Sequence, residues 1–140
     1  MKLTSIRLIA SDIQQSVRFY EEILGLTAQW FTPDFAELST SSITLAIGST
    51  RTMQMFSDSP TIFGSMAPII IEFLVENVDH EYIRIKNSAS KIIQEPTTMP
   101  WGNRSLLFCD PDGNMLNFFT PLSPEAIKKF GVEATNQSTH

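Results

Sequence analysis

The sequence predicts an α+β fold made of two βαβββ modules, whose curved, half-open mixed sheets surround a cleft. Three observations predict it. A strand-to-helix pattern near the start of the chain recurs 65 residues later. Short strand-like runs follow each copy of that pattern. A chain of 140 residues also suits one domain that buries a core of its own.

The first module begins with alternating, β-rich residues at 3–10. Asp12 then offers a helix N-cap, and Gly25 offers a C-terminal stop. Between them, four apolar residues recur at the spacing of one helical face: Ile13, Val17, Tyr20 and Leu24. This is a strand that leads into an amphipathic helix.

The second module repeats this sequence pattern. Ile71, Phe73 and Val75 stand where Ile6, Leu8 and Ala10 stood, and Asn77 takes the place of Asp12. The helical face is repeated by Val78, Tyr82, Ile85 and Ala89. Seven apolar positions and one cap therefore agree at a single offset, which predicts an internal duplication.

Six further runs complete the modules as strands, at residues 27–32, 35–39, 42–48, 92–95, 104–109 and 115–120. Residues 110–113 read Asp-Pro-Asp-Gly, a strong turn signal that explains both carboxylates without catalysis. We therefore expect one domain over residues 1–125, with module 1 at about 3–48 and module 2 at about 67–121. Residues 122–140 are expected to form a short helix, begun by Ser123 and ended by Gly131, and a frayed tail.

The connection at residues 49–66 carries Met and Phe side chains among polar residues. It is expected either to cover core edges or a dimer contact, or to act as a lid over a ligand.

Composition and charge exclude several classes. The chain is 42% hydrophobic and 18% charged, with a net charge of −5, so it lacks the basic surface of a nucleic-acid binder. No apolar run approaches the roughly 20 residues of a membrane span, and no signal-peptide pattern is present. Cys109 is the only cysteine, which excludes an internal disulfide and a cysteine-based zinc site. We expect a cytoplasmic protein with Cys109 buried as a small apolar residue.

Several segments resemble the vicinal oxygen chelate superfamily, which includes glyoxalase I, extradiol dioxygenases and bleomycin-resistance proteins. The resemblance lies in Ser11-Asp12-Ile13, Phe19-Tyr20 and Leu24-Gly25-Leu26, then in Pro100-Trp101-Gly102, and above all in residues 108–114, Phe-Cys-Asp-Pro-Asp-Gly-Asn. It covers about residues 3–121. It implies a ligand cavity between facing modules, in many members as a dimer.

The resemblance also implies four metal-ligand positions, which fall here on Ser5, Thr44, Ile70 and Asn117. None is a histidine or a carboxylate, and a divalent cation is held poorly by such side chains. The only histidines are His80, expected on the solvent side of the second helix, and His140 in the tail. No metal and no other cofactor is therefore expected.

Strand alternation puts Arg7 and Glu72 on the cavity face, as repeat mates. They are either a structural ion pair in space vacated by the metal, or ligand contacts in which Glu72 also serves as a candidate catalytic base. Trp101 is the preferred aromatic contact. The remaining candidate ligand-binding residues are Trp30, Arg104, Asn117 and Phe119.

The leading hypothesis is a homodimeric protein akin to the bleomycin-resistance branch, which binds a small organic molecule without a metal. One alternative is a lyase, isomerase or dioxygenase of the superfamily, with a degenerate metal site or with Glu72 as base. Another is a dimeric interaction protein whose cavity is filled by its own side chains.

Overall fold

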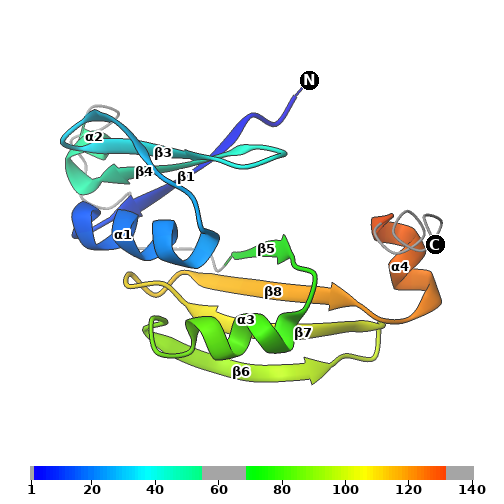
Figure 1. Cartoon of the computed structure of the whole chain (residues 1–140). Helices are drawn as coiled ribbons and strands as arrows, with labels where there is room; N and C mark the ends of the chain where they lie inside the picture. The colour runs from blue at the N-terminus through cyan, green and yellow to red at the C-terminus, as the bar shows by residue number, and fades with distance from the viewer. Residues whose placement is uncertain (1, 55–68, 132–140) are drawn as a thin grey trace. The chain divides into compact units, whose positions relative to one another are not determined.

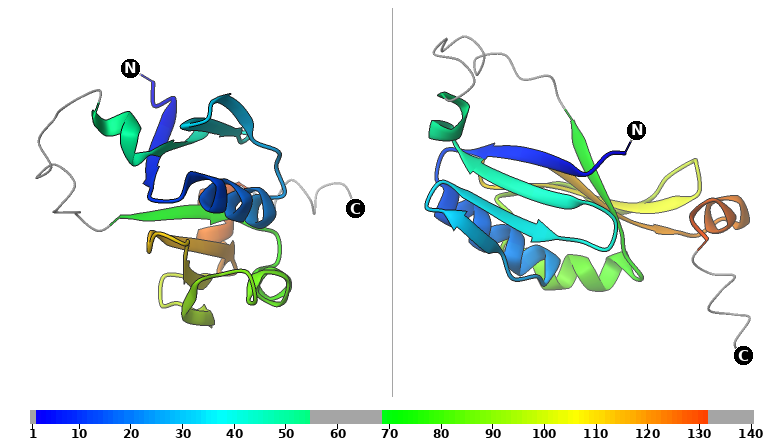
Figure 2. Two further views of the ribbon diagram at one scale, coloured as in Figure 1. Left: turned by 90° about the vertical axis from the view of Figure 1, so that its left-hand side faces the viewer. Right: turned by 90° about the horizontal axis from the view of Figure 1, so that it is seen from above.

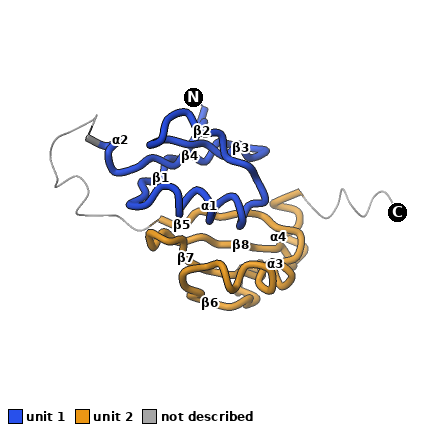
Figure 3. Tube along the Cα trace, turned by 60° about the vertical axis from the view of Figure 1, so that its left-hand side comes forward, with its two compact units in different colours: residues 1–68 blue, residues 69–140 orange. Residues whose placement is uncertain are grey.

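The computed structural model describes residues 2–54 and 69–131, and the chain divides into two compact units, residues 1–68 and 69–140 (Figure 3). The first unit contains β1 (Ser5–Ala10), α1 (Ile13–Leu24), β2 (Gln29–Thr32), β3 (Phe35–Ser39), β4 (Thr44–Ser49) and α2 (Thr50–Gln54). The second contains β5 (Ile70–Leu74), α3 (Val78–Ile85), β6 (Lys91–Thr98), β7 (Asn103–Cys109), β8 (Met115–Pro121) and α4 (Pro124–Phe130). Each unit has the βαβββ order, and the α+β fold class is confirmed.

The sheet of the first unit has the strand order β1-β4-β3-β2, with β1 parallel to β4 and the other pairs antiparallel. Seen from above, β1, β4 and β3 lie side by side (Figure 2, right). Alternate residues of each strand face α1, which packs on β3 and β4. The buried apolar side chains of this unit include Leu8, Ala10, Val17, Tyr20, Ile23, Ala36, Leu38, Leu45 and Ile47.

The second unit repeats this plan with the order β5-β8-β7-β6, in which β5 is parallel to β8. Its helix α3 crosses one face of the sheet (Figure 1). The buried apolar side chains here include Val78, Ile85, Leu106, Phe108, Leu116 and Phe118. The Phe118 ring meets Phe108 and Phe73 edge to face, with centroids 5.0 and 5.7 Å away.

The predicted caps are present. Asp12 Oδ1 accepts a hydrogen bond from the Gln15 amide, and Gly25 ends α1 in the left-handed region at φ 67°. Asn77 Oδ1 accepts from the amides of Asp79 and His80 at the start of α3. At α4 the Ser123 hydroxyl accepts from the Ala126 amide.

The structure differs from the expectation at several element ends. Ala89 does not extend the second helix, because α3 ends at Ile85. The first strand starts at Ser5 rather than at residue 3, and Leu3 is exposed. Residues 50–54 form α2 inside the expected connection, and the rest of that connection, like the expected tail with His140, lies outside the described residues. No helix in residues 2–54 and 69–131 is long and apolar enough to cross a bilayer.

Candidate functional site

In the second unit, the sheet face turned away from α3 carries a polar pair between apolar side chains. Alternation along β5 puts Ile70, Glu72 and Leu74 on this face, and Ile70 and Leu74 are 47% and 44% exposed. The parallel register with β8 sets Met115, Asn117 and Phe119 directly beside them, in that order. We call these six residues the β5–β8 face.

Glu72 and Asn117 are joined on this face by a hydrogen bond of 2.9 Å from Asn117 Nδ2 to Glu72 Oε2. The amide must have this orientation, because an amide oxygen turned toward a carboxylate would be repelled. Asn117 is only 9% exposed, and its Oδ1 has no hydrogen-bond partner among the described residues. The pair therefore presents one exposed acceptor, the Glu72 carboxylate, beside a buried amide oxygen that no described protein group satisfies.

Short helices close one end of the open face in both units. The Phe119 ring is 6% exposed and contacts Phe130 of α4, with centroids 4.8 Å apart. In the first unit Gly48 is the repeat mate of Phe119, and a side chain at Gly48 would collide with Thr52 of α2. Phe119, a candidate ligand contact, is thus engaged by the protein's own α4.

Trp101 lies in the turn between β6 and β7 and is 64% exposed. Gly102 follows it at φ 97°, and a Cβ at this position would collide with the Ser123 side chain. Only glycine allows both this backbone conformation and this close approach. The indole is therefore presented at the surface by a turn that is fixed against the start of α4.

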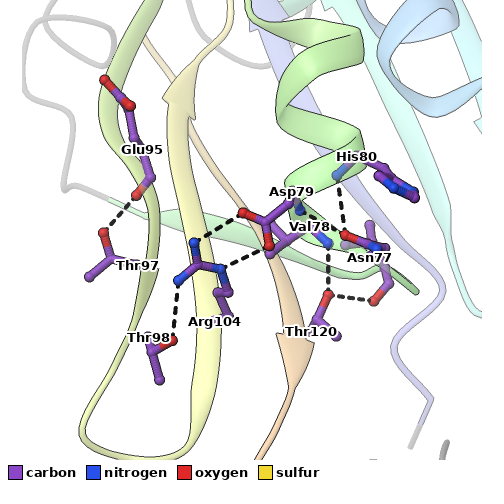
Figure 4. Close-up of polar contacts among 10 residues, drawn as sticks. Asn77, Val78, Asp79, His80, Glu95, Thr97, Thr98, Arg104 and Thr120 are labelled. Atoms are coloured by element: carbon purple, nitrogen blue, oxygen red, sulfur yellow. Dashed lines mark hydrogen bonds and ion pairs between the residues drawn. The ribbon is translucent and has the colours of Figure 1, made fainter.

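Arg104 lies on the opposite face of the sheet from Asn117, because it pairs with Thr120 in β8. Its guanidinium donates to both carboxylate oxygens of Asp79 in α3, at 2.9 and 3.0 Å, and to the Thr98 hydroxyl (Figure 4). The Arg104 hydrogen bond holds the pKa of the Asp79 carboxyl below its ordinary value. The structure therefore does not bring Arg104, one of the candidate ligand-binding residues, to the β5–β8 face.

In the first unit, Arg7 lies on the face turned away from α1, as alternation predicts, and its guanidinium carbon is 4.7 Å from the centre of the Phe35 ring. Sequence reasoning did not single out Phe35 as a partner. The signal was available, because alternation in residues 35–39 puts Phe35 and Glu37 on this same face.

Trp30 lies on the other face, toward α1, because it pairs with the buried Ala36. It lines a cavity of about 580 Å³ between α1 and β2. The sequence placed Trp30 among the residues of the shared cleft, and the structure instead gives it a separate pocket within the first unit.

The positions that correspond to the superfamily's metal ligands do not fit a metal. Ser5 and Thr44 are paired and bring only hydroxyls, while Ile70 is paired with Met115, which brings a weakly coordinating thioether. Asn117 lies two residues after Met115 in β8, where it pairs with Glu72 of β5. Within residues 2–54 and 69–131, no three His, Cys, Asp or Glu side chains are grouped to hold an ion.

Residues 2–118 match the family model described as Glyoxalase/Bleomycin resistance protein/Dioxygenase superfamily. The uncharacterized protein YraH of Bacillus subtilis is 28% identical over 128 residues, which cover 87% of this chain and 100% of that protein.

Solved structures from several bacteria share the fold, including the following two. A glyoxalase/bleomycin resistance protein/dioxygenase from Nocardioides matches with a TM-score of 0.73 at 22% identity, over 89% of this chain and 85% of that one. A family enzyme from Burkholderia phytofirmans matches with a TM-score of 0.75 at 17% identity, over 87% of this chain and 100% of that one.

Proposed function

Because this chain belongs to the glyoxalase/bleomycin resistance protein/dioxygenase superfamily, we propose that it binds a small organic molecule on the β5–β8 face without a metal. In this proposal it functions like the bleomycin-resistance branch. The observation that carries the proposal is the Glu72–Asn117 hydrogen bond, set among exposed apolar side chains of one sheet face. Ligand sites commonly combine an apolar lining with a few fixed polar groups.

The chemistry of the pair selects the class of ligand. The exposed Glu72 carboxylate accepts hydrogen bonds and carries the charge of the pair, so the preferred partner carries N–H donors or a positive charge. Ile70 and Leu74 lie on either side of Glu72 on the same face and offer contact to an apolar body. We therefore propose an amphipathic amine or a related cation as the ligand.

A reaction with Glu72 as general base is the second candidate, favoured by a carboxylate that is exposed to solvent and oriented by Asn117. Native mass spectrometry separates the two functions. A ligand that is bound and recovered with both its mass and its NMR spectrum unchanged supports binding alone, whereas steady conversion that is lost in Glu72→Gln supports catalysis.

The binding proposal is tested with a defined probe, 2-naphthylmethylammonium, in an NMR titration of the ¹⁵N-labelled protein. For about 12 non-hydrogen atoms at about −0.3 kcal/mol each, the expected Kd is a few millimolar. Chemical shifts should change at Glu72, Leu74 and Asn117.

The variant Glu72→Gln removes the charge and keeps the shape, and we expect binding to weaken about fivefold. Glu76→Gln is the matched control, because it removes the same charge beyond the end of β5. Equal affinity in wild type and Glu72→Gln, or shifts confined to other residues, would contradict the proposal.

A further inference from the structure

We propose that the first unit holds a second binding site, between α1 and β2, for small aromatic anions such as aromatic carboxylates. The site is the cavity of about 580 Å³ that Trp30 lines, a size usual for small-molecule pockets. All of its lining residues belong to the first unit, so the site needs nothing from the β5–β8 face.

The pocket follows from the dimensions of helix and sheet. A helix is about 10 Å across with its side chains, whereas neighbouring strands are about 4.8 Å apart, so one helix covers about two strands. Here α1 packs on β3 and β4, and β2 is the edge strand next to β3. The side of β2 that faces the helix is therefore incompletely covered, and the cavity lies there.

The helix wall of the pocket is one stripe of α1. Gln14, Arg18 and Glu21 recur at spacings of four and three residues, so they project from one face of the helix toward β2. Val17, which is 1% exposed, supplies an apolar base beside them. The stripe thus combines an apolar floor with an amide, a guanidinium and a carboxylate.

The strand wall is aromatic. Trp30 and Phe31 line the pocket and remain 43% and 53% exposed. The register of β2 against β3 shifts between Trp30 and Thr32, and such an irregularity turns side chains away from strict alternation. The Phe31 ring lies 6.1 Å from the Phe35 ring, which is on the face turned away from α1, so Trp30 is the residue that offers ring surface to a planar ligand.

The charges of the pocket select an anion. Arg18 makes no hydrogen bond or ion pair within residues 2–54 and 69–131, so its guanidinium is available to a ligand. Glu21 is the other charged group of the stripe, but its Oε2 already accepts a hydrogen bond of 2.8 Å from the Ala28 amide. A carboxylate on the ligand would accept from Arg18 and from the Gln14 amide group, while its ring contacts Trp30.

This ligand class is opposite in charge to the one proposed for the β5–β8 face, so the two proposals can fail separately. The probe is 2-naphthoate, and the control ligand is its uncharged analogue 2-naphthamide. The readout is the indole N–H signal of Trp30 in ¹⁵N spectra, which Trp101→Phe assigns because the chain has two tryptophans.

We expect 2-naphthoate to shift the Trp30 signal saturably in the wild type. Arg18→Gln should weaken this binding at least fivefold, the reduced effect of a charged contact that solvent reaches. Glutamine is a good helix former, so α1 should persist. Lys128→Gln in α4 removes the same charge from the other unit and should bind within about twofold of the wild type.

Two further measurements complete the test. The first separates the contribution of charge from that of apolar contact, and the second separates the α1–β2 pocket from the β5–β8 face. The amide 2-naphthamide should bind more weakly than 2-naphthoate and should not distinguish wild type from Arg18→Gln. Glu72→Gln should leave the 2-naphthoate affinity unchanged. The proposal is overturned if the Trp30 signal does not respond, if Arg18→Gln binds 2-naphthoate as well as the wild type, or if the neutral amide binds equally well.

Discussion

Replacing Asn117 by leucine should stabilise the protein while it weakens binding at the β5–β8 face. Asn117 is 9% exposed and its buried Oδ1 has no hydrogen-bond partner among the described residues, and such an oxygen costs about 1–3 kcal/mol. Leucine has the same number and branching of side-chain heavy atoms and removes this cost. It also removes the hydrogen bond to Glu72, worth about 1 kcal/mol, but that carboxylate is exposed and regains water. The net expectation is a gain of about 1 kcal/mol.

Urea unfolding followed by far-UV circular dichroism measures this gain. With a slope near 2 kcal/mol per molar urea, the midpoint should rise by about 0.5 M at unchanged slope. The matched control is Asn114→Leu, because Asn114 Nδ2 is satisfied by Asp110 Oδ2 at 2.8 Å and its loss should destabilise the protein.

In the same variant, Asn117→Leu, 2-naphthylmethylammonium should bind more weakly, since Glu72 is no longer oriented by the Asn117 amide. A stabilised protein with weakened binding indicates a residue kept for function. A loss of more than about 1 kcal/mol on Asn117→Leu would refute the reasoning and give Asn117 a structural role.

Four further outcomes are expected. Asp110→Ala should lower the free energy of unfolding by about 3 kcal/mol in urea titrations, because the buried carboxylate accepts from the amides of Asp112 and Asn114. The Arg104 guanidinium holds the pKa of Asp79 below 3.8, so the pair stabilises the fold above about pH 4, and this stability is lost as the pH falls through the lowered pKa. Arg104→Gln should therefore unfold more easily than wild type at about pH 6 and similarly at about pH 2. Elemental analysis after exposure to zinc, nickel or manganese and dialysis should find no stoichiometric ion, and one retained ion per chain would restore a metal-dependent function. Light scattering at micromolar concentration should give the mass of a homodimer, against which a clean monomer mass would count.

Local sequence signals located most of the elements. The duplication offset of 65 residues, the caps at Asp12 and Asn77 and the glycine at residue 25 mark where α1 and α3 begin and where α1 ends. These signals work because a cap satisfies backbone groups within a few residues of itself. Alternation also identified the helix-facing side of β1, where Leu8 and Ala10 are buried.

Alternation of residues along the strands predicted only part of the candidate site. Alternation predicted that Arg7 and Glu72 face away from the helices, and that Asn117 and Phe119 share one side of β8. It could not show that Asn117 stands opposite Glu72, because the register between two strands depends on how distant segments pair.

What the sequence by itself determined is the βαβββ duplication, the starts of α1 and α3, the end of α1, and that none of the four expected metal-ligand positions carries a histidine or a carboxylate. The tertiary structure alone decided the partners of the candidate residues: Asp79 for Arg104, Phe130 for Phe119 and the α1–β2 pocket for Trp30. The physical reason is the distance along the chain over which each kind of interaction acts. Caps and periodicity act over a few residues, whereas each of these partners is brought close by sheet register and helix packing between segments far apart in the chain.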